Sequence, residues 1–204
     1  MNTTTAPNAL TSITLEVPDI ADAERFYAAF DLGSQLEFRQ PAEHSEGFRG
    51  FTISLIVSQP ANAEVLLDAA IDAGATVIKP AAKNLWGFGG TVKAPDGTIV
   101  KVATSKKKNT EPASSRIDDV VVLLAASNVP ASKRFYSEQG FTPGKSFGSY
   151  VEFETRPGTI KLGLYKRSAL AKDAGVPEKG SGAHRIAFGN ERGAFTDPDG
   201  FTWI

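Results

Sequence analysis

The chain of 204 residues contains no cysteine, only two histidines and only one methionine. The missing cysteine excludes disulfide bonds, thiolate nucleophiles and zinc–thiolate sites. Long apolar runs are missing too: Val120 to Ala126 is the longest, and a bilayer span needs roughly 20 residues. The start of the chain, Met1 to Pro7, has neither the basic nor the apolar region of a secretory signal. We therefore expect a cytoplasmic protein with no membrane partner.

An excess of either charge is also absent. Lys and Arg total 22 against 23 Asp and Glu, which gives a formal net charge of −1. Nucleic-acid binding depends on a basic excess or patch, so nucleic acid is not an expected partner. A P-loop, a dinucleotide fingerprint and a nucleophile elbow are all lacking, and with them the support for several large enzyme classes.

What the sequence does contain is an internal repeat. One repeated unit is an apolar strand followed by a helix with Arg-Phe-Tyr, and the other is a Pro-Asp-Gly turn followed by a strand. The copies of the first unit are Ile13–Tyr27 and Val120–Tyr136, and those of the second are Ala94–Val100 and Asp197–Trp203. A half of roughly a hundred residues is therefore used twice.

The repeat defines the expected organisation of the chain. The two halves span residues 10–104 and 117–204. A linker rich in Lys, Ser and Pro, residues 105–116, separates the halves, and a disordered tail, residues 1–9, precedes them.

Apolar periodicity predicts the elements within each half. Ile13 to Val17 alternates apolar and polar side chains, as a strand with one buried face does. Asp19 is the predicted N-cap of the next helix, and an alanine-rich helix is expected from about Asn62 to Ala73. Both Pro-Asp-Gly sequences predict hairpin turns.

The halves differ in length at two places. Between Phe188 and Pro198 the second half has a short polar connection where the first has a helix, a strand and the Trp86–Gly90 loop. The second half is thus shortened by one helix. It also has room for a hairpin, Tyr150–Thr155 and Thr159–Tyr165, that the first half lacks. Because each half lacks a piece that the other keeps, we expect the two to close one shared structure.

This ordered set of elements resembles the vicinal oxygen chelate superfamily, which includes glyoxalase I, extradiol dioxygenases and bleomycin-resistance proteins. The resemblance rests on the Phe-Tyr helices, the helix end at Asp72–Ala75, the Trp86–Gly90 loop and the Pro-Asp-Gly hairpins, and it covers both halves. It implies an α+β fold in which repeated βαβββ units form a curved mixed sheet around a cavity, with helices outside.

The resemblance also implies where a metal would bind. Catalytic members hold a divalent ion with His or Glu on opening strands and Glu on closing strands of paired units, ligands suited to a Lewis acid. The residues at those positions here are Ser12 and Val121 (or Asp119) for the opening strands and Lys101 and Ile204 for the closing strands. Elsewhere in the chain, only His184 aligns with an opening-strand histidine of the metal-binding members. We therefore expect no metal cofactor, and a divalent metal is the disfavoured alternative.

A remaining ligand site would be lined by aromatic side chains and a few polar ones. The candidates come from the glycine-rich loop, the additional hairpin, the opening strand and the last strands: Trp86, Phe88, Tyr150, Tyr165, His184, Glu16 and Trp203. Core packing or a solvated sheet face is the competing interpretation for each of them. No catalytic residue can be assigned.

Hypotheses from different functional classes stay open. The first is a metal-independent protein that binds a small apolar or aromatic molecule, as the bleomycin-resistance branch implies. The alternative is a divergent lyase, isomerase or dioxygenase-like enzyme of the same superfamily, using His184 with Glu16 or Glu152, or using a divalent metal. A scaffold without a ligand is the third. A monomer and a homodimer are both compatible with two halves in one chain.

Overall fold

The computed structural model describes residues 8–30, 32, 35–41, 43–155 and 160–204. The helices of this part are α1 (Ile20–Ala28), α2 (Pro60–Asp72), α3 (Val129–Glu138) and α4 (Arg167–Ala174). The strands are β1 (Leu10–Glu16), β2 (Leu36–Arg39), β3 (Ser45–Gly47), β4 (Phe51–Ile56), β5 (Thr76–Asn84), β6 (Gly87–Lys93), β7 (Ile99–Thr104), β8 (Asp119–Ala126), β9 (Pro143–Phe147), β10 (Tyr150–Phe153), β11 (Lys161–Lys166), β12 (Gly180–Gly182), β13 (Ile186–Asn190), β14 (Phe195–Thr196) and β15 (Thr202–Trp203). The fold is α+β, with curved mixed sheets that do not close.

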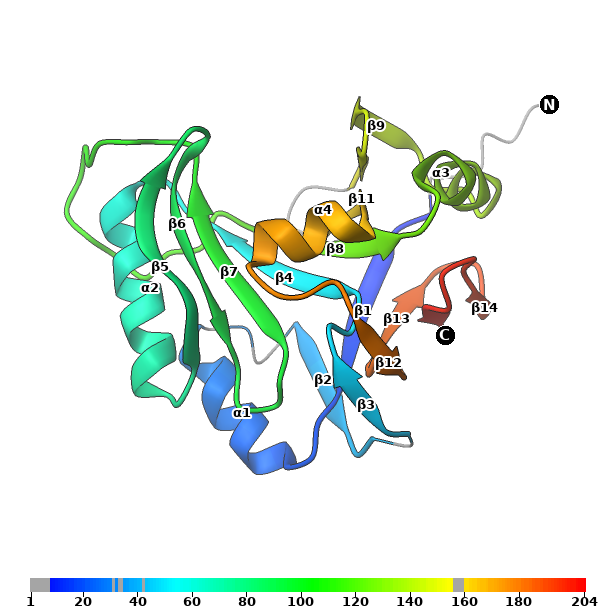
Figure 1. Ribbon diagram of the computed structural model, residues 1–204, viewed down its shortest axis with the longest axis horizontal. Helices are drawn as coiled ribbons and strands as arrows, with labels where there is room; N and C mark the ends of the chain where they lie inside the picture. Colours follow the sequence, from blue (N-terminus) through cyan, green and yellow to red (C-terminus); the bar gives the residue numbers. More distant parts are fainter. Residues whose placement is uncertain (1–7, 31, 33–34, 42, 156–159) are drawn as a thin grey trace.

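The larger sheet combines two complete βαβββ units (Figure 1). One runs from β4 through α2 to β7 and the other from β8 through α3 to β11, and the strand order is β5-β6-β7-β4-β8-β11-β10-β9. Opening and closing strands are parallel within each unit. The units join where β4 and β8 pair antiparallel, from Phe51 opposite Leu124 to Ile56 opposite Asp119.

The second sheet combines two shortened units from the ends of the chain. Its order is β14-β15-β13-β1-β2, so β1 near the N-terminus pairs antiparallel with β13 near the C-terminus. Residues 191–194 connect β13 to β14 without a helix. The additional hairpin of the second half is present as β10 and β11. Each predicted half is thus one shortened and one complete unit, and both halves contribute to both sheets. A two-stranded sheet, β12 with β3, completes the pairing among the described residues.

Capping and turn residues behave as the sequence predicts. The Asp19 side chain accepts a hydrogen bond from Asp22 N at the start of α1, and Asn128 caps α3 in the same way through Ala131 N. Gly97 and Gly200 adopt φ values of +88° and +92° in the two Pro-Asp-Gly turns, a conformation that glycine adopts without strain. The turns connect β6 to β7 and β14 to β15.

The linker and Asn8, near the end of the expected tail, are held by specific hydrogen bonds. Two polar residues at the start of α2 bind the linker: Gln59 Oε1 accepts from Thr110 N and Glu111 N, and Asn62 Oδ1 accepts from Ser114 N. Asn8, assigned to the tail, is buried and donates from Nδ2 to the Gln139 carbonyl oxygen at 3.1 Å. The preceding residues 1–7 lie outside the described part of the chain. None of the described helices has the length and apolar character to cross a membrane.

Helix α4, which apolar periodicity does not predict, lies on the face of the large sheet opposite to α2 (Figure 1). The alternation along β7 shows this directly, since Val100 and Val102 belong to the main core with α2. Ile99 belongs instead to a smaller cluster with Leu170 and Ala174 of α4. We call the face that carries α4 the inner face.

The two repeated motifs contact each other in both halves. Tyr27 of α1 donates to Asp96 Oδ2 at 3.2 Å, and Tyr136 of α3 donates to Asp197 Oδ2 at 2.8 Å. Burial, followed by the adjacent carboxylate, raises the pKa of both tyrosines well above its usual value, so both hydroxyls remain donors. The first bond links α1 to the turn between β6 and β7, and the second links α3 to the turn between β14 and β15.

Removing the Tyr136 hydroxyl should cost more stability than removing that of Tyr27. The Tyr136 oxygen also accepts from Trp203 Nε1 at 3.2 Å in the core, so Tyr136→Phe leaves that donor unpaired. We expect a loss of about 1–3 kcal/mol in the free energy of unfolding, measured by urea denaturation. The matched control, Tyr27→Phe, should lose less, and an equal or larger loss there would contradict the assignment.

Burial raises the pKa of Asp197 above the ordinary value of 3.8. Because the folded value lies above the unfolded one, the stability linked to this proton is fully present below the unfolded pKa and is lost as pH rises through the folded pKa. We therefore measure the melting temperature of the wild type minus that of Asp197→Asn. This difference should increase as pH falls from about 7 to about 4. A difference that does not change with pH would contradict this expectation.

Candidate functional site

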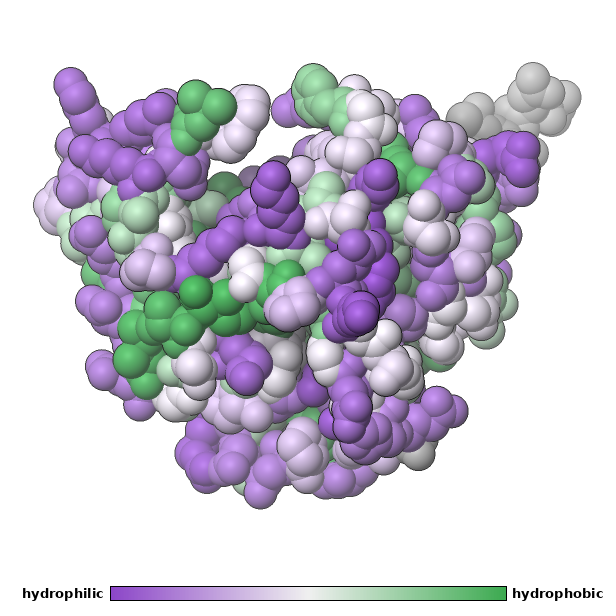
Figure 2. All heavy atoms as spheres, in the orientation of Figure 1, coloured by the Kyte–Doolittle hydropathy of each residue, from purple (hydrophilic) through white to green (hydrophobic). Residues whose placement is uncertain are grey.

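A hollow of about 690 Å³ opens on the inner face of the large sheet. The β5–β6 hairpin forms one wall, β4 and β7 form the floor, and the C-terminal end of α4 closes one side. Figure 2 shows the surface indented at this edge, between the β5–β6 hairpin and the part that carries β9. The lining residues are Ile56, Val57, Lys79, Pro80, Ala82, Asn84, Trp86, Phe88, Gly89, Gly90, Thr91, Lys101, Ala103, Thr104, Ser105 and Asp173. We call this cavity the Trp86 hollow.

The two predicted aromatic residues of the glycine-rich loop have different roles. Trp86 stands at the hairpin tip with 83% of its surface exposed, and its backbone N donates to Asn84 Oδ1 at 2.8 Å. Phe88 is buried in the main core and offers the hollow little surface. An indole is usually buried in a soluble protein, so the exposed ring of Trp86 marks this rim as a contact surface.

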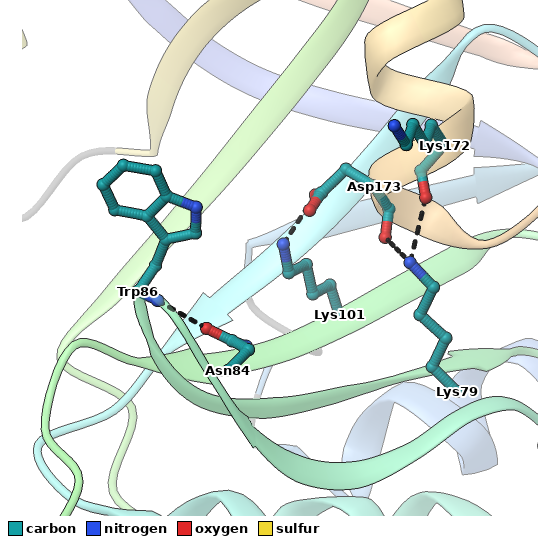
Figure 3. A network of polar contacts seen from close by, with 6 residues as sticks. All are labelled: Lys79, Asn84, Trp86, Lys101, Lys172 and Asp173. Carbon is teal, nitrogen blue, oxygen red and sulfur yellow. Dashed lines mark hydrogen bonds and ion pairs between the residues drawn. The ribbon is translucent and has the colours of Figure 1, made fainter.

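Two lysines reach across the hollow to α4 (Figure 3). Lys101 Nζ lies 2.5 Å from Asp173 Oδ2. Lys79 Nζ donates to the carbonyl oxygens of Lys172 and Asp173, at 2.9 and 2.6 Å. A cation at the C-terminal end of a helix interacts favourably with the helix dipole, so both lysines hold this end of α4 over the sheet.

Tyr150 and Tyr165 lie together, but outside the lining of the Trp86 hollow. They are direct neighbours on β10 and β11, with their ring centroids 5.8 Å apart. Tyr150 donates to Glu152 Oε2 at 3.1 Å, and burial, followed by this carboxylate, raises the pKa of the phenol. Tyr165 packs against the small cluster under α4. Tyr165 thus helps to position α4, and Tyr150 packs beside it.

Glu16 and His184 line a different hollow, of about 410 Å³, on the smaller sheet. Glu16 is buried and pairs with Arg39, whose Nη2 lies 2.6 Å from Oε1. His184 Nδ1 faces the Arg49 carbonyl oxygen at 2.5 Å, Nε2 faces that of Asp199 at 3.0 Å, and the ring stacks on Phe201. Carbonyl oxygens only accept hydrogen bonds, so neither nitrogen is directed as a metal ligand would be.

Trp203 is a core residue that lines neither hollow. Its side chain is fully buried, stacks on Phe195 and donates from Nε1 to Tyr136 Oη. Strand β15 lies inside its sheet, next to β13, and this side chain is on the packed face, where core packing was the competing interpretation. The seven candidates are therefore divided among the Trp86 hollow, the tyrosine pair, the smaller hollow and the core.

The residues across the inner face do not fit a divalent metal. In register, Thr91 lies beside Lys101, Lys101 beside Ser54, Ser54 beside Val121, and Val121 beside Lys161. The closing strands β7 and β11 thus carry ammonium groups, which repel metal ions. Within the described part of the chain, no three His, Cys, Asp or Glu side chains converge into a metal-binding group. The Pro-Asp-Gly pattern predicts Ile204 as the second closing position, whereas the closing strand of the second complete unit is β11, which carries Lys161.

Comparison with known proteins adds the fold family. No family model and no curated protein matches this sequence. Glyoxalase I from Zea mays is similar in structure, with a TM-score of 0.63 and 13% identity over 96% of this chain and 91% of that one. A protein proposed to be a dioxygenase, from Bacillus subtilis subsp. subtilis str. 168, has a TM-score of 0.53 and 12% identity over 94% and 71%. The chain has the vicinal oxygen chelate fold.

The inner face of the large sheet is shared by α4 and the Trp86 hollow. At 12–13% identity the likeness shows the fold alone, so the function has to be argued from the side chains themselves.

His184→Ala tests whether this histidine is structural. The ring lies between the segments at Arg49 and Asp199, where either neutral tautomer donates to one of the two carbonyl oxygens, and it stacks on Phe201. Its loss should therefore lower the free energy of unfolding by about 1–3 kcal/mol. The loss should be the same with and without EDTA. If EDTA destabilises the wild type to the level of the variant, His184 is a metal ligand instead.

Proposed function

We propose that this protein binds a small apolar or aromatic molecule in the Trp86 hollow and does so without a metal ion. The observation that carries the proposal is the exposed indole of Trp86 beside a hollow of about 690 Å³. That volume lies within the range of small-molecule sites, about 300–1,000 Å³. An aromatic ligand covering the ring removes apolar surface from water, at about 25 cal/mol for each Å².

The rest of the lining supports the same class of ligand. Ile56, Val57, Pro80 and Ala103 add apolar surface, and Gly89 leaves backbone at the lining where a side chain would reduce the space. A Cβ at Gly89 would lie 2.3 Å from the Val102 carbonyl oxygen, so this position accepts only glycine without a shift of the strands. The open floor is therefore built into the pairing of β6 and β7.

The side chains favour binding without a metal ion. Lys101 and Lys161 occupy the closing-strand positions of the inner face, and both are already paired with carboxylates, Asp173 and Asp119. The enzymatic alternative relies on His184 with Glu16 or Glu152. His184 faces two carbonyl oxygens, and Glu152 accepts from Tyr150 outside the smaller hollow. No contact among these described residues favours catalysis.

We propose that the protein functions as a monomer. A sedimentation measurement tests this, and a homodimer is the alternative outcome. A single chain supplies both complete units of the large sheet, through β4 and β8. The Trp86 hollow forms between the first of these units and α4 of the same chain.

Nile red, an uncharged aromatic probe whose fluorescence rises in apolar surroundings, tests the site. Trp86→Ala should weaken its affinity by about tenfold or more, since about 1.4 kcal/mol corresponds to that factor. Phe147→Ala is the matched control, because Phe147 is an exposed aromatic residue on β9 that does not line the hollow. It should change the affinity less than about twofold. EDTA should have no effect.

Equal losses in Trp86→Ala and Phe147→Ala would show that the probe adheres to exposed rings and would contradict the proposed site. Loss of binding in EDTA would contradict metal independence. A thermal-shift screen of aromatic metabolites can then identify ligands, since a molecule that binds only the folded state raises the melting temperature.

A further inference from the structure

We infer that the Trp86 hollow selects an aromatic or apolar molecule that carries a single carboxylate, and that Lys101 binds this carboxylate in exchange for Asp173. This inference rests on the proposed function and adds the chemical class of the ligand. It follows from how the charged residues of the hollow are shared between the sheet and α4.

The hollow carries one more cation than anion. Of its lining residues three are charged, Lys79, Lys101 and Asp173, so two positive groups face one negative group. One ligand carboxylate would bring the formal charge of the lining to neutrality. An uncharged ligand would leave the excess unmatched, and a cation would add to it.

The two lysines are not equally free to bind a ligand. Two of the three N–H donors of Lys79 Nζ are already bonded to the backbone carbonyl oxygens of Lys172 and Asp173, in the last turn of α4. Lys101 has a single acidic partner, Asp173, and its neighbours across the strands are the hydroxyl residues Thr91 and Ser54. Lys101 is therefore the cation whose main contact a ligand can replace.

The contact with Asp173 is of a kind that is easily exchanged. The side chains of Lys101 and Asp173 are 27% and 37% exposed, and ion pairs in contact with water contribute little to stability. When Asp173 turns away, water can hydrate its carboxylate. Lys79 keeps its bonds to the backbone of α4, so the helix end can stay in place. A ligand carboxylate that also places a ring against Trp86 gains from both contacts.

Lys161 forms a comparable ion pair on the same face, with side chains that are 33% and 38% exposed, but both of its members lie on the sheet. Its Nζ lies 2.8 Å from Asp119 Oδ2, and Asp119 belongs to β8, the strand directly beside β11. Both partners thus belong to the sheet. Lys101 is paired across to a helix from the other half of the chain. Lys161 does not line the Trp86 hollow, so it serves as a matched control.

The test compares two probes of nearly the same shape, 2-naphthoate and 2-naphthamide, by isothermal titration calorimetry. The wild type should bind the carboxylate about tenfold more tightly than the amide, because a charge-assisted hydrogen bond is stronger than a neutral one. Lys101→Met should remove this preference and change the affinity for the amide by less than about twofold. Asp173→Asn, which removes the competing carboxylate, should tighten 2-naphthoate binding, and Lys161→Met should alter neither affinity.

The outcomes separate the inference from the proposed function. Equal binding of both probes, or a preference that survives in Lys101→Met, would overturn the carboxylate inference while the binding function stands. Weaker 2-naphthoate binding in Asp173→Asn would overturn the exchange, and this variant keeps the test decisive if Lys101→Met folds poorly. Failure of both probes to bind would overturn the function and the inference together.

Discussion

The antiparallel pairing of β4 with β8 is the constraint on which the rest of the structure depends. It joins one complete unit from each half, in register from Phe51 to Ile56, and so creates a single inner face. Because side chains alternate along a strand, that register decides which residues reach the face. Lys101, Ser54, Val121 and Lys161 share one line across it only because the units meet in this way. Helix α4 and the Trp86 hollow then divide the face between them.

The outer side of the molecule is held by a different set of contacts. The tyrosines of the repeated Phe-Tyr motifs bind carboxylates in or beside the Pro-Asp-Gly turns, once in each half. These bonds are buried, and a buried hydrogen bond to a charged group is costly to lose. The ion pairs of Lys101 and Lys161 lie on the inner face and are partly exposed, whereas the tyrosine–carboxylate bonds are buried in the core, so a change at Lys101 need not disturb the core.

Much of the fold follows from local sequence, whereas the site follows from it only in part. Asp19 and the Pro-Asp-Gly turns are short-range signals that carry their own mechanism, and the complementary gaps of the halves predict a shared structure. Helix α4 gives no such signal, since Leu170 is the single large apolar residue in Arg167–Ala174. Its position is set by tertiary contacts, and so are the roles of Lys79 and Asp173. The sequence around Trp203 is compatible with either core packing or ligand binding. Only the strand order of the folded protein shows that the side chain is in the core.

The pairing of β1 with β13 has a consequence for synthesis of the chain on the ribosome. Residues 10–16 must wait for residues 186–190 before the smaller sheet can form, and until then one edge of β1 offers unpaired backbone groups. Open strand edges invite pairing with other chains, and contacts so distant in sequence form slowly. The two complete units, 51–104 and 119–166, have nearer partners and can assemble first. Strand β1 is thus the segment most exposed to wrong pairing while the rest of the chain is made.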